Sequence, residues 1–261
     1  MKFIKHTFAL LTCAFVTTTA SAATVQITFD NPIFNGSGYD NVHIKFANPA
    51  ASTSYITEYV SAGRFQGTAS KVNGVNESIF FDGLDDVYLY CYDIYQNINH
   101  GQSLNYSINA YAPNARTLDF IGAVNKVLSP SSSAIDPYAW LRGVNANQGA
   151  AIQLGLWESK YESTGWNLGN GSFSAWDLDT NTTSWWNQFV AAIDSSAAID
   201  GSYVMVFANS TYQDMIAGDP PANVPEPGSL ALIGAALAGL AFTRKRCSRA
   251  GQIRKLASSF G

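Results

Sequence analysis

Short runs of alternating apolar and polar residues occupy the first third of the chain and predict β-strands. Clusters of Asn, Gly, Pro and Ser, which are typical of turns, separate these runs. The predicted strands cover residues 25–29, 42–46, 55–60, 78–81 and 87–94. Because alternate side chains of a strand point to the same side, Cys91 shares one face with Val87, Leu89 and Asp93. The pattern therefore places Cys91 in the middle of a strand.

The periodicity changes after residue 117, where apolar residues recur at intervals of three and four. This spacing predicts helices over residues 118–128, from about Gln148 to Tyr161, and from a capping Ser184 to Ile193. A β-prone stretch returns at residues 203–208. Strands, then helices, then a closing strand indicate an α+β protein. We expect a β-rich lobe, sandwich or barrel-like, packed against a small helical lobe.

The first 22 residues have the layout of a secretory signal peptide. Lys2 and Lys5 precede an apolar run at residues 8–16, and small residues follow at 20–22. We expect this segment to form a signal helix, and signal peptidase to cleave it so that the exported chain begins near Ala23.

The C-terminal region combines a Pro-Glu-Pro string, an apolar stretch at residues 230–243 and a basic cluster. The string and the cluster consist of Val224, Pro225, Glu226, Pro227, Arg244, Lys245 and Arg246. Positive charge after an apolar stretch favours a cytoplasmic location for that flank. Because the stretch is shorter than the ~20 residues of a stable spanning helix, we expect a single membrane helix that anchors the chain transiently in the inner membrane.

These three features, in this order, resemble the PEP-CTERM domain of Gram-negative bacteria, which an exosortase recognises and cleaves near the Pro-Glu-Pro string. The resemblance implies sorting to the cell surface or to the extracellular matrix of a biofilm. It divides the chain into a signal peptide at 1–22, an extracytoplasmic domain at 23–221, a sorting segment at 222–246 and a basic cytoplasmic tail at 247–261. PEP-CTERM domains usually stop at the basic cluster, so the tail is a departure, and a plain C-terminal membrane anchor is the alternative.

The region between the two ends is strongly acidic. Residues 23–223 contain seven Lys or Arg against eighteen Asp or Glu, so their net charge is near −11, whereas the whole chain carries −4. This charge is unfavourable for binding nucleic acid. Asp177, Asp179 and Asn181 have the opening spacing of a Ca²⁺ loop, but the Gly and the closing Glu of such a loop are missing. We predict a capped turn there, and neither a metal nor a cofactor.

The positions of the three cysteines make Cys91 a candidate functional residue. Cys13 leaves with the signal peptide and Cys247 lies in the tail, so the exported body contains Cys91 alone. In an oxidising compartment a lone thiol is a liability unless it is buried, paired between chains or used chemically.

Two segments suggest a chemical use for this thiol. They are Leu-Tyr-Cys-Tyr-Asp-Ile at residues 89–94 and Gln-Leu-Gly-Leu-Trp-Glu at residues 153–158. They resemble the paired signatures of bacterial thioester (TQXA-like) domains, a Tyr-Cys element and a Gln-x-Ala-Ile-Trp element. The resemblance implies an internal thioester between Cys91 and Gln153. Tyr90, Tyr92 and Trp157 would then form a surround that excludes water.

A thioester stores an electrophile that a partner nucleophile can attack. The resemblance therefore implies an adhesin-like protein that attaches covalently, once per molecule, to a surface amine or hydroxyl of a polysaccharide or a protein. Such a protein is not a turnover enzyme. Gln148 is a nearby rival to Gln153 as the acyl donor.

Other interpretations remain open at this point. Cys91 could be an inert core residue of a non-covalent structural or lectin-like envelope protein. Four tryptophans could then form a sugar-stacking surface: Trp166, Trp176, Trp185 and Trp186. Pairing of Cys91 with His100 could also indicate a cysteine hydrolase, although no protease motif surrounds either residue.

Overall fold

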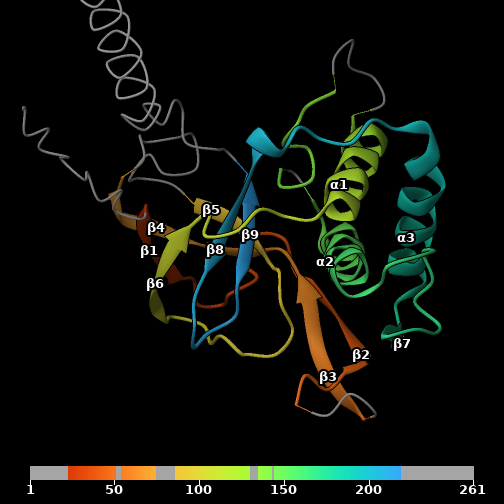
Figure 1. Cartoon of the computed structure of the whole chain (residues 1–261), viewed down its shortest axis with the longest axis horizontal. Coiled ribbons are helices and arrows are strands. Elements are labelled where there is room, and N and C mark those ends of the chain that lie inside the picture. Colours follow the sequence, from red (N-terminus) through yellow and green to blue (C-terminus); the bar gives the residue numbers. More distant parts are fainter. Residues whose placement is uncertain (1–22, 51–53, 75–85, 130–134, 143, 219–261) are drawn as a thin grey trace, which may run out of the picture. The chain divides into compact units, whose positions relative to one another are not determined.

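The computed structural model describes residues 23–50, 54–74, 86–129, 135–142 and 144–218 (Figure 1). Contacts divide the chain into two units, and all the described residues belong to the larger one, Ala22–Val224. The expected signal helix, the strand at 78–81, the membrane helix of the sorting segment and the basic tail lie outside the described residues. Within the described ranges, no helix is both long enough and apolar enough to cross a membrane.

Six antiparallel strands close into a barrel. In order around it they are β1 (Thr24–Phe29), β4 (Phe65–Asn73), β5 (Asp86–Cys91), β9 (Met215–Gly218), β8 (Val204–Ala208) and β6 (Ser103–Ile108). Alternate residues of β1, namely Val25, Ile27 and Phe29, are fully buried, as expected for a strand with one side facing a core. Closure pairs both edges of every strand, so the barrel has no free edge.

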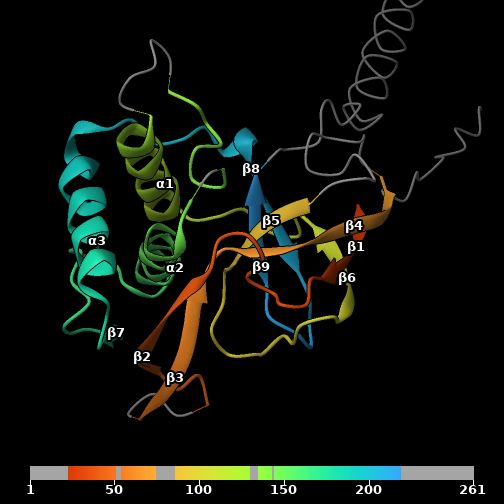
Figure 2. The same cartoon turned by 180° about the vertical axis from the view of Figure 1, so that it is seen from behind.

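Three helices are grouped beside the barrel in both views (Figures 1 and 2). They are α1 (Ala115–Leu128), α2 (Ala146–Tyr161) and α3 (Thr180–Ala192), and two short 3₁₀ turns follow, η1 (Ile193–Ser195) and η2 (Gly201–Tyr203). Helix α2 is buried on all sides from Gly149 to Ser159, which is typical of a helix in the centre of a core. A Cβ atom at Gly155 would overlap the ring of Phe120, so the glycine leaves the space that this ring occupies against α2.

A second sheet has the antiparallel order β3 (Tyr55–Gly63), β2 (Tyr39–Ala47), β7 (Phe173–Trp176). Arg64 alone separates β3 from β4, so one continuous stretch of chain links this sheet to the barrel. On β2, Val42, Ile44 and Phe46 are buried, while the residues between them are partly exposed. The buried side of the sheet packs against α2.

The α+β expectation is confirmed, and the β-rich part is a barrel. Two local expectations are wrong. Cys91 is the last residue of β5, because the pairing with β9 ends at Cys91 and Met215. Helix α3 begins earlier than expected, because the side chain of Asp179 accepts a hydrogen bond from the backbone N–H of Asn181 and serves as the N-cap.

Candidate functional site

The end of β5 places Cys91 beside the chain that leads into β9. The backbone N–H of Tyr92 donates to the carbonyl of Asp214 at 2.7 Å, so the two segments stay together past the last strand pair. The side chain of Cys91 is 2 % exposed and its thiol is free. The fold therefore encloses this thiol in the core.

Gln213, just before β9, brings its carboxamide to the sulfur of Cys91. The distance from Cys91 Sγ to Gln213 Oε1 is 2.8 Å, and Gln213 Nε2 donates to the backbone carbonyl of Asp93 at 2.7 Å. Because a C=O bond is about 1.2 Å long, the sulfur lies within about 4 Å of the carboxamide carbon. Both polar ends of this carboxamide are thus oriented.

Gln153 of α2 reaches the same residue but contacts its main chain. Gln153 Oε1 accepts from the N–H of Cys91 at 2.9 Å, and Gln153 Nε2 donates to the carbonyl of Cys91 at 2.7 Å. The pairing of β4 with β5 stops at Phe65 and Leu89, so Cys91 has no strand partner on that side. The fully buried carboxamide of Gln153 takes the place of the missing strand and satisfies both backbone groups.

The three aromatic residues expected around the sulfur lie on two sides of β5. Trp157 lines a cavity together with Cys91. Tyr90 and Tyr92 alternate with Cys91 along the chain, and their rings contact other elements. Tyr90 stacks on Trp140, while the hydroxyl of Tyr92 pairs with that of Thr117 on α1 at 3.2 Å.

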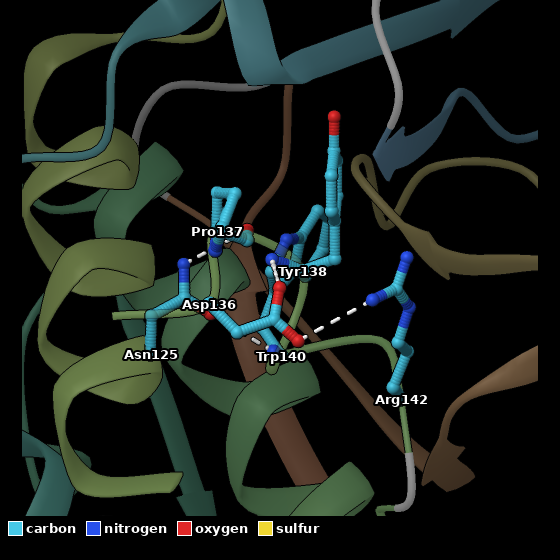
Figure 3. Close-up of polar contacts among 6 residues, drawn as sticks. All are labelled: Asn125, Asp136, Pro137, Tyr138, Trp140 and Arg142. Carbon is cyan, nitrogen blue, oxygen red and sulfur yellow. Dashed lines mark hydrogen bonds and ion pairs between the residues drawn. The ribbon is translucent and has the colours of Figure 1, made fainter. Parts of the chain in front are cut away.

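The loop that carries Trp140 is fixed to α1 by Asn125, as Figure 3 shows. Asn125 Nδ2 donates to the carbonyl of Pro137 at 2.9 Å, and Asn125 Oδ1 accepts from the N–H of Trp140 at 2.9 Å. The hydroxyl of Tyr90 then donates to the carbonyl of Trp140 at 3.1 Å. This loop therefore covers the side of β5 that faces away from the sulfur.

A cavity of about 240 Å³ leads to Cys91 and Gln213. Most of the residues that line it are apolar, including Trp157, and Glu58 alone is charged among the described residues that form it. Glu58 and Asn97 are exposed, whereas Cys91 and Gln213 are buried. The cavity thus connects the surface to the sulfur and the carboxamide.

Burial dominates the electrostatics of the site. It raises the pKa of the Cys91 thiol well above its usual range, and the nearby charge of Asp93 raises that pKa further. Burial also raises the pKa of Asp93 to about 6, and Asp93 accepts a hydrogen bond from the N–H of Asp214 at 3.1 Å. The thiol is therefore protonated at neutral pH and can donate to Gln213 Oε1.

The other candidate residues are placed elsewhere. Gln148 is part of the capping box of α2 with Asn145 and does not line the cavity at Cys91. His100 is exposed in the turn before β6 and does not line that cavity either. Asp179 caps α3, as described above.

The four tryptophans do not form one surface. Trp166 stacks on Phe120, Trp186 packs against Phe120 and Trp185 stacks on Phe189, all among the helices. Trp176 lies on β7 and is 40 % exposed. Only Trp176 of the four is thus a candidate for contact with a flat ligand.

Sequence reasoning did not find Gln213. It lies 122 positions from Cys91, and a separation of that size carries no periodic signal. The weak local signal is its place between the turn at residues 209–212 and the short apolar run at 215–217. Only the pairing of β5 with β9 brings it to the thiol.

Comparison with known proteins identifies the C-terminal segment. Residues 223–246 match the model of the PEP-CTERM protein-sorting motif. No curated protein and no solved structure matches the chain significantly. The motif implies that the protein is exported and processed by an exosortase, as the C-terminal pattern predicts. The matched residues lie outside the described ranges.

Proposed function

We propose that the exported body forms an internal thioester between Cys91 and the carboxamide of Gln213, and attaches through it to a partner nucleophile. The observation that carries this proposal is the 2.8 Å contact between Cys91 Sγ and Gln213 Oε1 in a buried site. Gln153 was the expected donor, but both polar atoms of its carboxamide bind the main chain of Cys91. We therefore assign Gln213 as the acyl donor and Gln153 as the residue that positions Cys91.

The bond would form by addition and elimination at one carbon. The Cys91 sulfur adds to the carboxamide carbon of Gln213, and the thiol proton is transferred to the carboxamide group. The carbon–nitrogen bond then breaks and the nitrogen leaves as ammonia, so that a thiol and an amide become a thioester and ammonia. The hydrogen bond from Gln213 Nε2 to the Asp93 carbonyl orients the leaving nitrogen away from the sulfur.

The partner would reach the thioester through the cavity. Its apolar lining, including Trp157, limits the access of water to the acyl group. Glu58 at the exposed end favours a positively charged amine over a neutral hydroxyl. The bound ammonium first loses a proton to solvent, and the neutral amine attacks the acyl carbon. The carbon–sulfur bond breaks as the amide forms, and a second proton from the nitrogen passes to the sulfur, so that the Cys91 thiol is released. Because the acyl group is consumed, each molecule reacts once and the protein is not a turnover enzyme.

The sorting motif supports the location of this reaction. Signal peptidase and exosortase would process the chain, with transient anchoring in the inner membrane, and deliver the body to the cell surface or extracellular matrix. There the protein would act as an adhesin or a matrix component of a biofilm. A polysaccharide or a protein that carries amines could be the target.

A second candidate function is a non-covalent structural envelope protein with an inert Cys91. One observation favours it: burial raises the pKa of this thiol, so the nucleophilic thiolate is scarce. The two functions differ in mass by one ammonia, so mass separates them.

The deciding experiment is the intact mass of the exported chain, purified under mild, non-nucleophilic conditions. We expect the wild type to lack the mass of one ammonia and Cys91→Ala and Gln213→Ala to have their full masses. Addition of methylamine should restore the wild-type mass plus one methyl group in place of hydrogen. A deficit that survives in Gln213→Ala but disappears in Gln153→Ala would transfer the donor role to Gln153. Full wild-type mass with a free thiol would contradict the thioester.

A further inference from the structure

The side of the three-stranded sheet that faces away from α2 carries a row of aromatic rings. Three residues directly opposite each other on neighbouring strands form it: Trp176 on β7, His43 on β2 and Tyr59 on β3. The rings of His43 and Trp176 are stacked with centroids 5.4 Å apart, and those of His43 and Tyr59 are 4.7 Å apart. We call these three residues the ring row. It extends about 10 Å across the sheet.

The ring row is open to solvent although it consists of large side chains. Trp176 is 40 % and Tyr59 is 62 % exposed. Two more exposed tyrosines lie on the same sheet, Tyr39 and Tyr55, and Lys45 lies over the ring of Tyr55 with 4.8 Å from Nζ to the centroid. Single exposed apolar residues are normal on a protein surface, but a cluster of this kind marks an interaction site.

The local structure holds the row in place. Asp177 directly follows Trp176, and its carboxylate lies 2.9 Å from Nδ1 of His43. Asp177 adopts a φ of 61°, in the left-handed region that non-glycine residues rarely occupy. This conformation turns the chain at the end of β7 and brings the carboxylate to the imidazole. The rings are therefore oriented before any ligand arrives, which lowers the entropy cost of binding.

The chemistry of this side indicates what it binds. The described outward positions of the three strands contain rings, small polar groups, one Lys and one Ala, but no Val, Ile, Leu or Met. They are Tyr39, Asn41, His43, Lys45, Ala47, Tyr55, Thr57, Tyr59, Ser61, Ser174 and Trp176. A protein partner typically uses anchors that fill pockets, and neither described cavity includes a residue of the ring row. A row of exposed rings with hydroxyl and amide groups beside it suits a ligand with apolar C–H faces and a rim of hydroxyls.

The net negative charge of the exported body makes an acidic ligand unfavourable. The exported body has a net charge near −11, so an acidic polymer would be repelled over the whole surface, whereas an uncharged one carries no such cost. Beside the row, the hydroxyl of Ser61 donates to Asn41 Oδ1 at 2.8 Å, which leaves the amide N–H groups of Asn41 for a ligand oxygen. We propose that the ring row is a binding platform for an uncharged polysaccharide, whose sugar rings contact the exposed Trp176 and Tyr59, with His43 between them.

This site is separate from the thioester and does not depend on it. No residue of the ring row lines the cavity at Cys91, whose lining includes Ile44 and Val60 of the opposite side and Ser61 near the row. A protein that binds a polysaccharide here could remain in a matrix without covalent attachment. Cys91→Ala should therefore bind polysaccharide as the wild type does, whatever the mass measurement shows.

Affinity gel electrophoresis of the exported chain tests the platform. The probes are four uncharged glucans, namely hydroxyethyl cellulose, xyloglucan, laminarin and dextran, with alginate as the acidic probe. We expect at least one glucan to retard the wild type and alginate to have no effect. Trp176→Ala and Tyr59→Ala should weaken retardation roughly tenfold or more in affinity, which corresponds to about 1.4 kcal/mol, and Tyr59→Phe should keep it.

Tyr203→Ala is the matched control, because Tyr203 is 40 % exposed like Trp176 but lies in η2, outside the sheet. It should be retarded like the wild type, and circular dichroism should show that every variant is folded. Three outcomes would overturn the platform: no retardation of the wild type by any of the glucans, equal retardation of a folded Trp176→Ala, or retardation by alginate alone.

Discussion

The cavity at Cys91 and the ring row lie on opposite sides of one small sheet and differ in their exposure to solvent. Cys91 and Gln213 are buried at the inner end of the cavity, with both polar atoms of the carboxamide hydrogen-bonded. Trp176 and Tyr59 are 40 % and 62 % exposed to solvent. A stored electrophile survives only where water is excluded, whereas recognition of a large polymer requires a surface that the polymer can reach. Strands β2 and β3 contribute residues to both regions, because alternate side chains point to opposite sides.

The largest effect should come from the two residues that would share the thioester. We expect wild-type protein to incorporate a fluorescent alkylamine covalently, and Cys91→Ala and Gln213→Glu to incorporate none, because neither variant can expel ammonia. Denaturing gel electrophoresis with fluorescence detection measures this. Trp176→Ala should be labelled like the wild type, because Trp176 does not contribute to the thioester. Labelling of Gln213→Glu at the wild-type level would break the assignment.

The loss of stability on substitution of Gln153 tests whether this glutamine has a structural role. Gln153→Met keeps the volume but leaves the buried N–H and C=O of Cys91 without partners. Each unsatisfied group costs about 1–3 kcal/mol, so the free energy of unfolding should fall by about 2–5 kcal/mol in urea denaturation. Gln188→Met on exposed α3 is the control and should change it by about 0.5 kcal/mol or less. An unchanged midpoint for Gln153→Met would argue against the structural role.

Stability should depend on pH through two buried carboxyl groups. Burial raises the pKa of Asp93 to about 6 and that of Glu158 to about 7. The folded state therefore binds protons more tightly than the unfolded chain. The contribution of these two groups to stability is fully present below pH ~4, where both states are protonated, and is lost as pH rises through about 6 to 7. The melting temperature should fall by a few degrees from pH 4.5 to pH 7.5.

Asp93→Asn and Glu158→Gln test the origin of that slope, because each removes one titrating group. Lys160 and Asp214 act on Asp93, and Glu162 and Arg116 act on Glu158, in addition to burial. The double variant should have a nearly flat melting profile over this range. A double variant that keeps the wild-type slope would place the pH dependence elsewhere in the molecule.

The smallest effect is expected at the exposed region. Trp176→Ala should lower the free energy of unfolding by about 1 kcal/mol or less, because it removes only a partly exposed ring and its stacking on His43. Trp157→Ala, at 3 % exposure, should cost about 3–5 kcal/mol. Equal losses in chemical denaturation would mean that the ring row is a structural element rather than a binding platform.

The sequence alone was sufficient to predict the sorting segment at the C-terminal end and the two longest helices. The Pro-Glu-Pro string, the apolar stretch and the basic cluster form a local linear signal, so their order was enough to identify export and sorting. Helices α1 and α2 follow from apolar spacing, because a helix is stabilised by contacts three and four residues apart. Strands β1, β2 and β3 follow from alternation, and β8 follows from its run of β-prone residues.

Only the tertiary structure decided the composition of the site. Strands β4, β6, β7 and β9 were not expected, since short strands are defined by their partners as much as by their own residues. Without β9, the sequence could not bring Gln213 to Cys91 across 122 positions. It selected Gln153 from a local motif, and the fold uses that residue where a strand partner is missing. Backbone pairing is a long-range property, and for that reason it alone determined which carboxamide meets the thiol.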